Sequence, residues 1–120
     1  MRMWETDVTY IEDWLDTLDE KTLVQVVAAI KYLSERGPDL KRPFVGKIEG
    51  SKHKGMKELR PGSSGASEVR ILFIFDPRRA AIMLLAGDKQ GQWEKWYRKA
   101  IPEADRRYDE YLDHMKMNGA

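Results

Sequence analysis

The sequence predicts an α+β fold in which an N-terminal helical hairpin packs on a small antiparallel sheet and a C-terminal helical segment follows. Apolar residues recur at helical spacing over residues 7–36, which is the pattern of amphipathic helices. The stretch from Lys52 to Lys89 instead breaks into short β-branched and aromatic runs divided by Gly, Pro, Ser and Asp, which is the pattern of β-hairpins. At 120 residues, the chain is expected to form one domain, residues 1–120, with its own core.

An edge strand anchored by Trp4 is one interpretation of residues 1–6, and two helices are expected between it and the rest of the sheet. Asp7 and Asp19 each precede an apolar stripe and are good N-cap residues. Arg36, Gly37 and Pro38 end the second helix with a basic last turn, a glycine suited to the position after a helix, and a residue that cannot continue it. The two helices are expected to pack on the sheet. Their apolar stripes are Val8, Ile11, Leu15 and Leu18, then Leu23, Val26, Val27, Ile30 and Leu33.

The central strand is expected at residues 69–75. Its hairpin neighbour is expected at residues 80–86, after an Asp-Pro break, and residues 56–60 form the third strand of an antiparallel meander. Side chains alternate between the two faces of a strand, and both faces of residues 69–75 are mostly apolar, so this strand is expected to be central and covered on both sides. Arg70 is the exception, and a charge on a nearly buried strand needs a partner.

A helical segment is expected after the sheet. Trp93, Trp96 and Tyr97 lie at positions i, i+3 and i+4 and therefore share one helical face. This stripe is either part of the core or a partly exposed surface on which bases can stack. Ile101-Pro102 is expected to interrupt the helix, because proline suits the first turn of a new helix. The new helix would pack through Tyr108, Tyr111, Leu112 and Met115.

The composition excludes several classes of protein. The chain has no cysteine, so disulfides and thiolate metal sites are excluded, which fits a cytoplasmic protein. No signal peptide and no apolar run of membrane length are present, so no membrane partner is expected. The two histidines are far apart and no nucleotide-binding motif occurs, so no metal site and no cofactor are expected.

The charge is unevenly distributed along the chain. Residues 1–40 carry four Lys/Arg and nine Asp/Glu, whereas residues 41–99 carry fourteen Lys/Arg and six Asp/Glu. A basic excess on the β-rich middle of the chain indicates an anionic partner at the sheet. The alternative is that the helices simply carry acidic residues in their first turns, and charge alone leaves both interpretations open.

A set of basic residues on the expected sheet can bind phosphate and stabilise the extra charge of a phosphorane-like transition state. RNA supplies its own nucleophile, the 2′-hydroxyl, so the protein need only orient that oxygen, remove its proton and stabilise charge. Histidine suits proton transfer near neutral pH, so His53 is a candidate for that role. Each cation could equally be a solvated surface charge. The set comprises Lys52, His53, Lys54, Lys57, Arg60, Arg70 and Lys89, with Tyr97, Trp93 and Trp96 nearby.

Three stretches of this sequence resemble the RelE/HigB toxins of type II toxin–antitoxin systems, in particular the branch called phage-derived Gp49-like. The stretches are WLDTLDE at 14–20, KHKGMKELRPGSSG at 52–65 and RILFIFDPRRAAIMLLAGDKQGQWEKWYRKAIPEADRRY at 70–108. The resemblance implies a RelE/ParE-like fold and a ribosome-dependent endoribonuclease that cuts mRNA without metal. It also implies a cognate antitoxin, usually a helix-turn-helix DNA-binding protein.

The resemblance assigns roles to individual residues unevenly. The arginine that opens the central strand of RelE-like nucleases and meets the scissile phosphate matches Arg70, and the basic residue after the last strand matches Lys89. Tyr97 matches the tyrosine of the following helix, although Trp96 competes for that place. Glu58 stands where some members have lysine, so the residue that transfers the proton stays open. The implied catalytic set is Arg70, Lys89, Tyr97 and Lys57, and the implied RNA-binding set is Lys52, His53, Lys54, Arg60, Trp93 and Trp96.

Two other functions are compatible with the same fold. A ParE-like relative would poison gyrase and would not need an arginine and a lysine that converge on one phosphate. A non-catalytic phage-derived nucleic-acid-binding protein would need only a diffuse basic surface. Fold alone does not separate these functions, because one fold can carry different sites.

Overall fold

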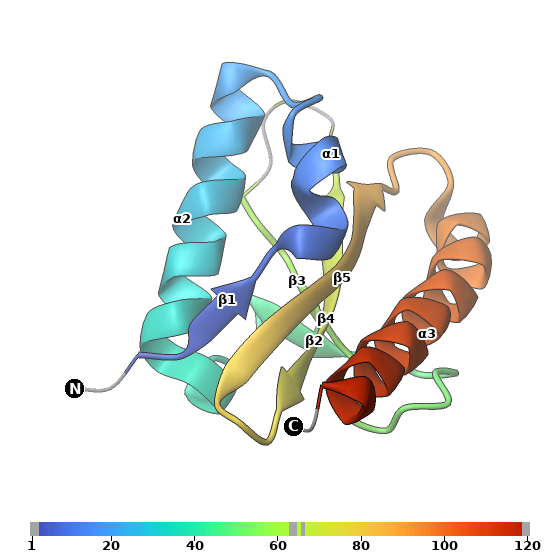
Figure 1. The fold of residues 1–120 in the computed structure, drawn as a ribbon. Coiled ribbons are helices and arrows are strands. Elements are labelled where there is room, and N and C mark those ends of the chain that lie inside the picture. Colours follow the sequence, from blue (N-terminus) through green and yellow to red (C-terminus); the bar gives the residue numbers. More distant parts are fainter. Residues whose placement is uncertain (1–2, 63–64, 66, 119–120) are drawn as a thin grey trace.

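The structure, a computed structural model, describes residues 3–62, 65 and 67–118. A five-stranded sheet lies between helix α2 on one face and helix α3 on the other (Figure 1). The chain therefore has the predicted α+β fold, with helices at the N-terminal end and a helix at the C-terminal end. The elements in chain order are β1 (Glu5–Asp7), the 3-10 helix η1 (Thr9–Ile11), α1 (Glu12–Leu15), α2 (Glu20–Arg36), the 3-10 helix η2 (Gly37–Asp39), β2 (Val45–Lys47), β3 (Lys57–Leu59), β4 (Val69–Asp76), β5 (Ala80–Asp88) and α3 (Trp93–Met117).

The sheet has the strand order β1-β5-β4-β3-β2. The predicted antiparallel meander is confirmed, since β3 pairs with β4 and β4 pairs with β5. The edge strand β2 was not predicted, whereas the edge strand β1 overlaps the stretch of residues 1–6 in which a strand anchored by Trp4 was considered. The antiparallel strand β2 lies in the connection before β3, and β1 runs parallel to β5, so the sheet is mixed. Both edge strands have three residues, which is too short for an alternating pattern to be visible in the sequence.

Two apolar cores lie on the two faces of the sheet. Ile71 and Phe73 of β4 are fully buried in the core on the α2 side, with Val26 and Leu33 of α2. Leu72, between them in sequence, belongs to the core on the α3 side. This alternation confirms that β4 is central and covered on both faces, as its two apolar sides predicted.

The N-terminal helical hairpin is shorter than its sequence pattern suggested. Its first arm consists only of η1 and α1, and the Asp7 carboxylate accepts a hydrogen bond from the Thr9 backbone N–H at 3.0 Å. The second arm, α2, begins as predicted, because the Asp19 carboxylate accepts a bond from the Thr22 N–H at 3.1 Å. It ends at Gly37, whose φ is 56°. Glycine is required there, since an added Cβ would lie 2.3 Å from the Trp4 indole nitrogen.

The predicted break at Ile101-Pro102 is wrong, because α3 continues through Pro102 to Met117. Proline removes the backbone N–H that would bond to the carbonyl four residues earlier, but Pro102 lies on the exposed side of the helix, where solvent can satisfy that carbonyl. Ala100 and Ala104 on the inner side are buried against the sheet, and this packing holds the helix together. No helix among the described residues is long and apolar enough to span a membrane.

Candidate functional site

The candidate site is a cluster of polar side chains around a buried carboxylate, Glu58 of β3. Glu58 is only 4% exposed and faces α3. Arg60 donates to one carboxylate oxygen through Nε at 3.1 Å and Nη2 at 2.9 Å. The Tyr97 hydroxyl donates to the other oxygen at 2.6 Å, and Arg70 Nε lies 3.9 Å from that oxygen. We call these four residues the Glu58 cluster.

The short edge strand β2 makes room for this cluster. Gly46 of β2 is directly opposite Glu58 of β3 in the antiparallel register. A Cβ atom at Gly46 would lie 2.4 Å from Arg60 Nη2, so the guanidinium occupies the space that a side chain would fill. The absence of a side chain at Gly46 therefore lets Arg60 fold back across the sheet and bind one oxygen of Glu58 with two donors, and such charge-assisted bonds are stronger than neutral ones.

Arg70 lies at the start of β4, with 17% of its side chain exposed. Its Nη1 donates to the Val69 carbonyl oxygen at 2.8 Å, which fixes the side chain close to its own strand. Its Nε is buried and has no hydrogen-bond partner among the described residues. The nearest acceptor is Glu58 Oε1, which at 3.9 Å is beyond hydrogen-bond distance, so Arg70 and Glu58 attract each other only as charges.

Lys89 lies beside Arg70 at the end of β5. Antiparallel pairing sets Val69 opposite Asp88, and the Lys89 backbone N–H donates to the Glu68 carbonyl at 3.0 Å, so this end of β5 meets the start of β4 as predicted. Lys89 is 6% exposed. Its ammonium lies 4.2 Å from the ring centroid of Trp93. Burial first, and then the nearby charge of Arg70, lower the pKa of Lys89 below its ordinary value.

Tyr97 completes the cluster from the second turn of α3. Burial, followed by its hydrogen bond to Glu58, raises the pKa of the phenol to about 12. The hydroxyl is therefore protonated at neutral pH and acts as a donor, not as a base. Trp96 packs instead on β5, because a Cβ at Gly87 would lie 2.7 Å from its indole nitrogen. Trp93 is 58% exposed above Lys89, so the tryptophan stripe divides into one packing residue and one surface residue.

Several residues named from the sequence lie outside this cluster. Lys57 points to the opposite face of β3, because its neighbours Met56 and Glu58 face α3 and Leu59 packs on the α2 side. Lys52 and His53 both pair with Asp109 of α3, the latter at 2.9 Å. Asp109 is twelve positions along the helix from Tyr97, about 18 Å. Lys54 is exposed in the same loop.

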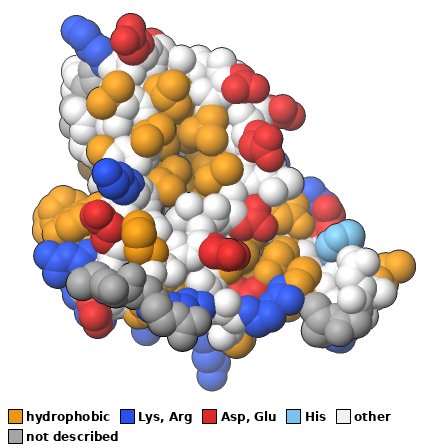
Figure 2. All heavy atoms as spheres, turned by 60° about the vertical axis from the view of Figure 1, so that its left-hand side comes forward, with side chains coloured by type: hydrophobic (Ala, Val, Ile, Leu, Met, Phe, Trp, Pro, Cys, Tyr) orange, Lys and Arg blue, Asp and Glu red, His pale blue; other side chains and the backbone are white. Residues whose placement is uncertain are grey.

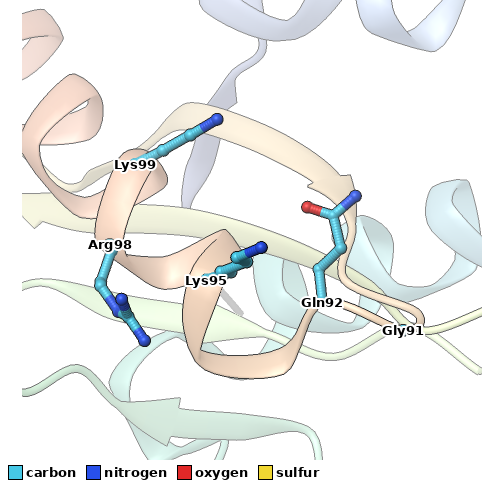
Figure 3. Close-up of a pocket in the computed structure, with 5 residues that line it drawn as sticks. All are labelled: Gly91, Gln92, Lys95, Arg98 and Lys99. Atoms are coloured by element: carbon cyan, nitrogen blue, oxygen red, sulfur yellow. The ribbon is translucent and has the colours of Figure 1, made fainter.

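A basic pocket on the first turns of α3 was not predicted. It has a volume of about 540 Å³ and is lined by Gly91, Gln92, Lys95, Arg98 and Lys99, which Figure 3 labels. Its three cations lie at i, i+3 and i+4, a spacing that brings them to one side of the helix and that could have been recognised in the sequence. Among the described residues, no three His, Asp or Glu side chains stand close enough to hold a metal ion.

Tyr97→Phe is expected to show how much the tyrosine–glutamate hydrogen bond stabilises the fold. Because the folded pKa of about 12 lies above the ordinary value of 10.0, the contribution of Tyr97 is complete below about pH 10 and is lost as the pH rises towards 12. The difference in unfolding free energy between the wild type and Tyr97→Phe should therefore be constant up to pH 10 and become smaller above it. Urea unfolding at a series of pH values measures it, and a gap that widens above pH 10 would contradict the assigned bond.

Comparison with known proteins adds three relationships. Residues 13–109 match the protein family described as "Phage derived protein Gp49-like (DUF891)". "Putative toxin HigB2" of Mycobacterium tuberculosis is 55% identical over 109 residues, which cover 91% of this chain and 54% of that protein. "Putative toxin HigB3" of the same organism is 45% identical over 102 residues, which cover 85% of this chain and 87% of that protein. The chain thus spans about half the length of the first relative and most of the second.

Proposed function

The chain belongs to the phage-derived Gp49-like protein family, and from this premise we propose that it is the toxin of a type II toxin–antitoxin system that cuts mRNA on the ribosome. Two relatives that are 55% and 45% identical to the chain over the aligned residues are named as toxins, which supports the first part of the proposal. The observation that carries the second part is the convergence of Arg70, Lys89 and Tyr97 at one corner of the sheet.

The reaction that suits this corner is a transfer within the RNA itself. The 2′-oxygen of a ribose attacks the neighbouring phosphorus, the bond from phosphorus to the 5′-oxygen breaks, and a 2′,3′-cyclic phosphate and a 5′-hydroxyl result. The 2′-hydroxyl loses one proton and the departing oxygen gains one, so the reaction needs no oxidant, reductant or other reactant. The protein accelerates it by holding the phosphate and by stabilising charge as that charge develops.

Lys89 and the residues of the Glu58 cluster each have a part in that task. The Arg70 side chain, which is 17% exposed, binds a phosphate oxygen through its guanidinium, and Lys89 adds a second positive charge on the same side. The Tyr97 hydroxyl donates its single proton to Glu58, so its oxygen orients the sugar by accepting a hydrogen bond from a ribose hydroxyl. Glu58 is a positioning residue: it binds Arg60 and Tyr97 and lies next to Arg70, so these groups are held in place before RNA arrives.

The RNA strand has a path beyond the reacting phosphate. Trp93 is 58% exposed over Lys89 and offers a surface on which a base can stack. Lys95, Arg98 and Lys99 continue the positive charge along the outside of α3, where further phosphates can bind. Lys57 is left out of this proposal because it lies on the other face of the sheet.

The proposed partners follow from the same function. The protein would act on the ribosome with its bound mRNA, inhibit translation, and be neutralised by a cognate antitoxin of the helix-turn-helix DNA-binding type. The basic corner is a suitable target for an acidic segment of that antitoxin, because a segment that pairs with Arg60 or Arg70 excludes RNA from the same donors.

The test is cleavage of a defined mRNA on purified ribosomes. The protein is treated with EDTA and exchanged into EDTA-free buffer beforehand, which removes any bound metal without dissociating the ribosomes. We expect cuts that end in a 2′,3′-cyclic phosphate, and none in the same mRNA without ribosomes. RNA binding without cleavage would favour a non-catalytic nucleic-acid-binding protein. Loss of gyrase activity with intact mRNA would replace the proposal by a ParE-like function.

A further inference from the structure

Helix α2 carries apolar side chains on its exposed outer face as well as on the inner face that packs on the sheet. Its inner face buries Val26 and Leu33 completely. On its outer face, Val24 is 61% exposed and Val27 is 54% exposed. Figure 2 shows a cluster of hydrophobic side chains on this side of the molecule. Exposed apolar side chains that gather on one surface are typical of a contact site, so the outer face of α2 is a candidate surface for a second partner.

The patch continues into a groove. Ala28, one turn after Val24, lines a hollow of about 510 Å³ together with Tyr32 and Phe44. The rings of Tyr32 and Phe44 meet edge to face with centroids 5.2 Å apart, and Phe44 is 43% exposed. The patch and the groove together form a strip along α2 and across to the chain before β2, a shape into which the apolar face of one helix fits.

The charge beside the strip indicates the chemistry of its partner. Residues 9–20, which precede and begin α2, carry five acidic and no basic residues: Glu12, Asp13, Asp16, Asp19 and Glu20, all exposed. In Figure 2, acidic side chains line one edge of the apolar cluster. Electrostatic complementarity therefore selects a partner with lysine or arginine along the corresponding margin. A second copy of the chain would present the same acidic margin, and like charges across an interface disfavour it.

We infer that the outer face of α2 is a docking surface for an amphipathic helix of a second protein. The apolar stripe of that helix covers Val24, Val27 and Phe44, and its basic margin meets the acidic segment of residues 9–20. The surface lies on the opposite side of the sheet from Lys89 and Tyr97, and it meets the Glu58 cluster only at Arg60, which also borders the groove. A protein bound to α2 would leave Lys89 and Tyr97 accessible to RNA.

The test uses synthetic helical peptides of about 18 residues, long enough to form a helix on binding. The first has leucines at i, i+3, i+4 and i+7 and lysines along one margin; the second has glutamates in place of those lysines. Fluorescence anisotropy should show binding of the lysine peptide, at least about tenfold weaker binding of the glutamate peptide, and loss of affinity as salt rises. Equal affinity of the two peptides, or no binding of either, would overturn the inference.

Variants locate the binding on α2. The double variant Val24→Lys/Val27→Lys should bind the lysine peptide at least about tenfold more weakly, whereas Met117→Lys, at an exposed residue of α3, should bind as the wild type does. Thermal unfolding confirms that both variants fold, and both should cut mRNA at the wild-type rate, which separates this surface from the nuclease proposal. A wild-type dimer that sedimentation detects and the double variant lacks would assign the face to a second copy and overturn the inference.

Discussion

Replacing Arg70 by alanine is expected to reduce mRNA cleavage at least about a hundredfold while the protein remains folded. Loss of one fixed donor that stabilises transition-state charge typically costs two to three orders of magnitude in rate. The guanidinium of Arg70 is held by the Val69 carbonyl at 2.8 Å, and its buried Nε has no acceptor among the described residues. Folding should survive, because Glu58 keeps its bonds to Arg60 and Tyr97, and the substitution removes an unsatisfied donor.

Two further variants make this result specific. Arg106→Ala removes an exposed arginine that pairs with Glu103 on the outside of α3, and it should cut mRNA at the wild-type rate. Arg70→Lys keeps the positive charge but replaces the planar guanidinium and its several donors by a single ammonium group, so it should recover only part of the activity. The rate constant for cutting a saturating ribosome–mRNA complex measures all three variants. If folded Arg70→Ala cuts at the wild-type rate and still arrests growth, the assigned site is wrong.

Phe73→Ala is expected to lower the free energy of unfolding by roughly 3–5 kcal/mol, the usual cost of truncating a buried phenylalanine. Phe73 is fully buried in the middle of β4, and its ring packs edge to face on Phe75 with centroids 5.2 Å apart. The neighbouring strands and α2 hold the backbone around it, so the cavity cannot collapse completely.

Denaturant unfolding of Phe73→Ala beside Phe44→Ala tests this expectation. Phe44 is 43% exposed, so its truncation should be much less destabilising than that of Phe73. A change below about 1 kcal/mol for Phe73→Ala would contradict its central place in the core. The comparison holds residue type constant and varies only burial.

The sequence predicted the centre of the fold better than its edges. In β4 the alternation of side chains over eight residues is long enough to identify both the strand and its two covered faces. The strands β1 and β2 have three residues each; Trp4 was the one local sign of β1, and no local pattern indicates β2. The helix break predicted at Pro102 was wrong for a different reason. Proline is a local signal for the start of a new helix, but the packing of its neighbours on the sheet keeps α3 continuous.

The candidate site was predictable only in part. The proximity of Arg70 and Lys89 follows from antiparallel pairing, since the end of β5 must meet the start of β4. Glu58 was noted only as a departure from a family pattern. Its hydrogen bond to Tyr97 joins residues 39 positions apart, and no local sequence pattern predicts such a contact. Lys57 and Glu58 are adjacent, so one position in the register decides which of them faces α3.

The parallel pairing of β1 with β5 affects the order in which the molecule can assemble. Glu5 aligns with Ala80, 75 positions later, whereas β4 and β5 are joined by a tight turn. Pairings between distant segments form late, because a long loop must close before the contact stabilises anything. During synthesis, β1 must wait unpaired until β5 has been made, and Tyr97 follows later still. A ribosome that translates this chain would thus have made most of the protein before Arg70, Lys89 and Tyr97 come together.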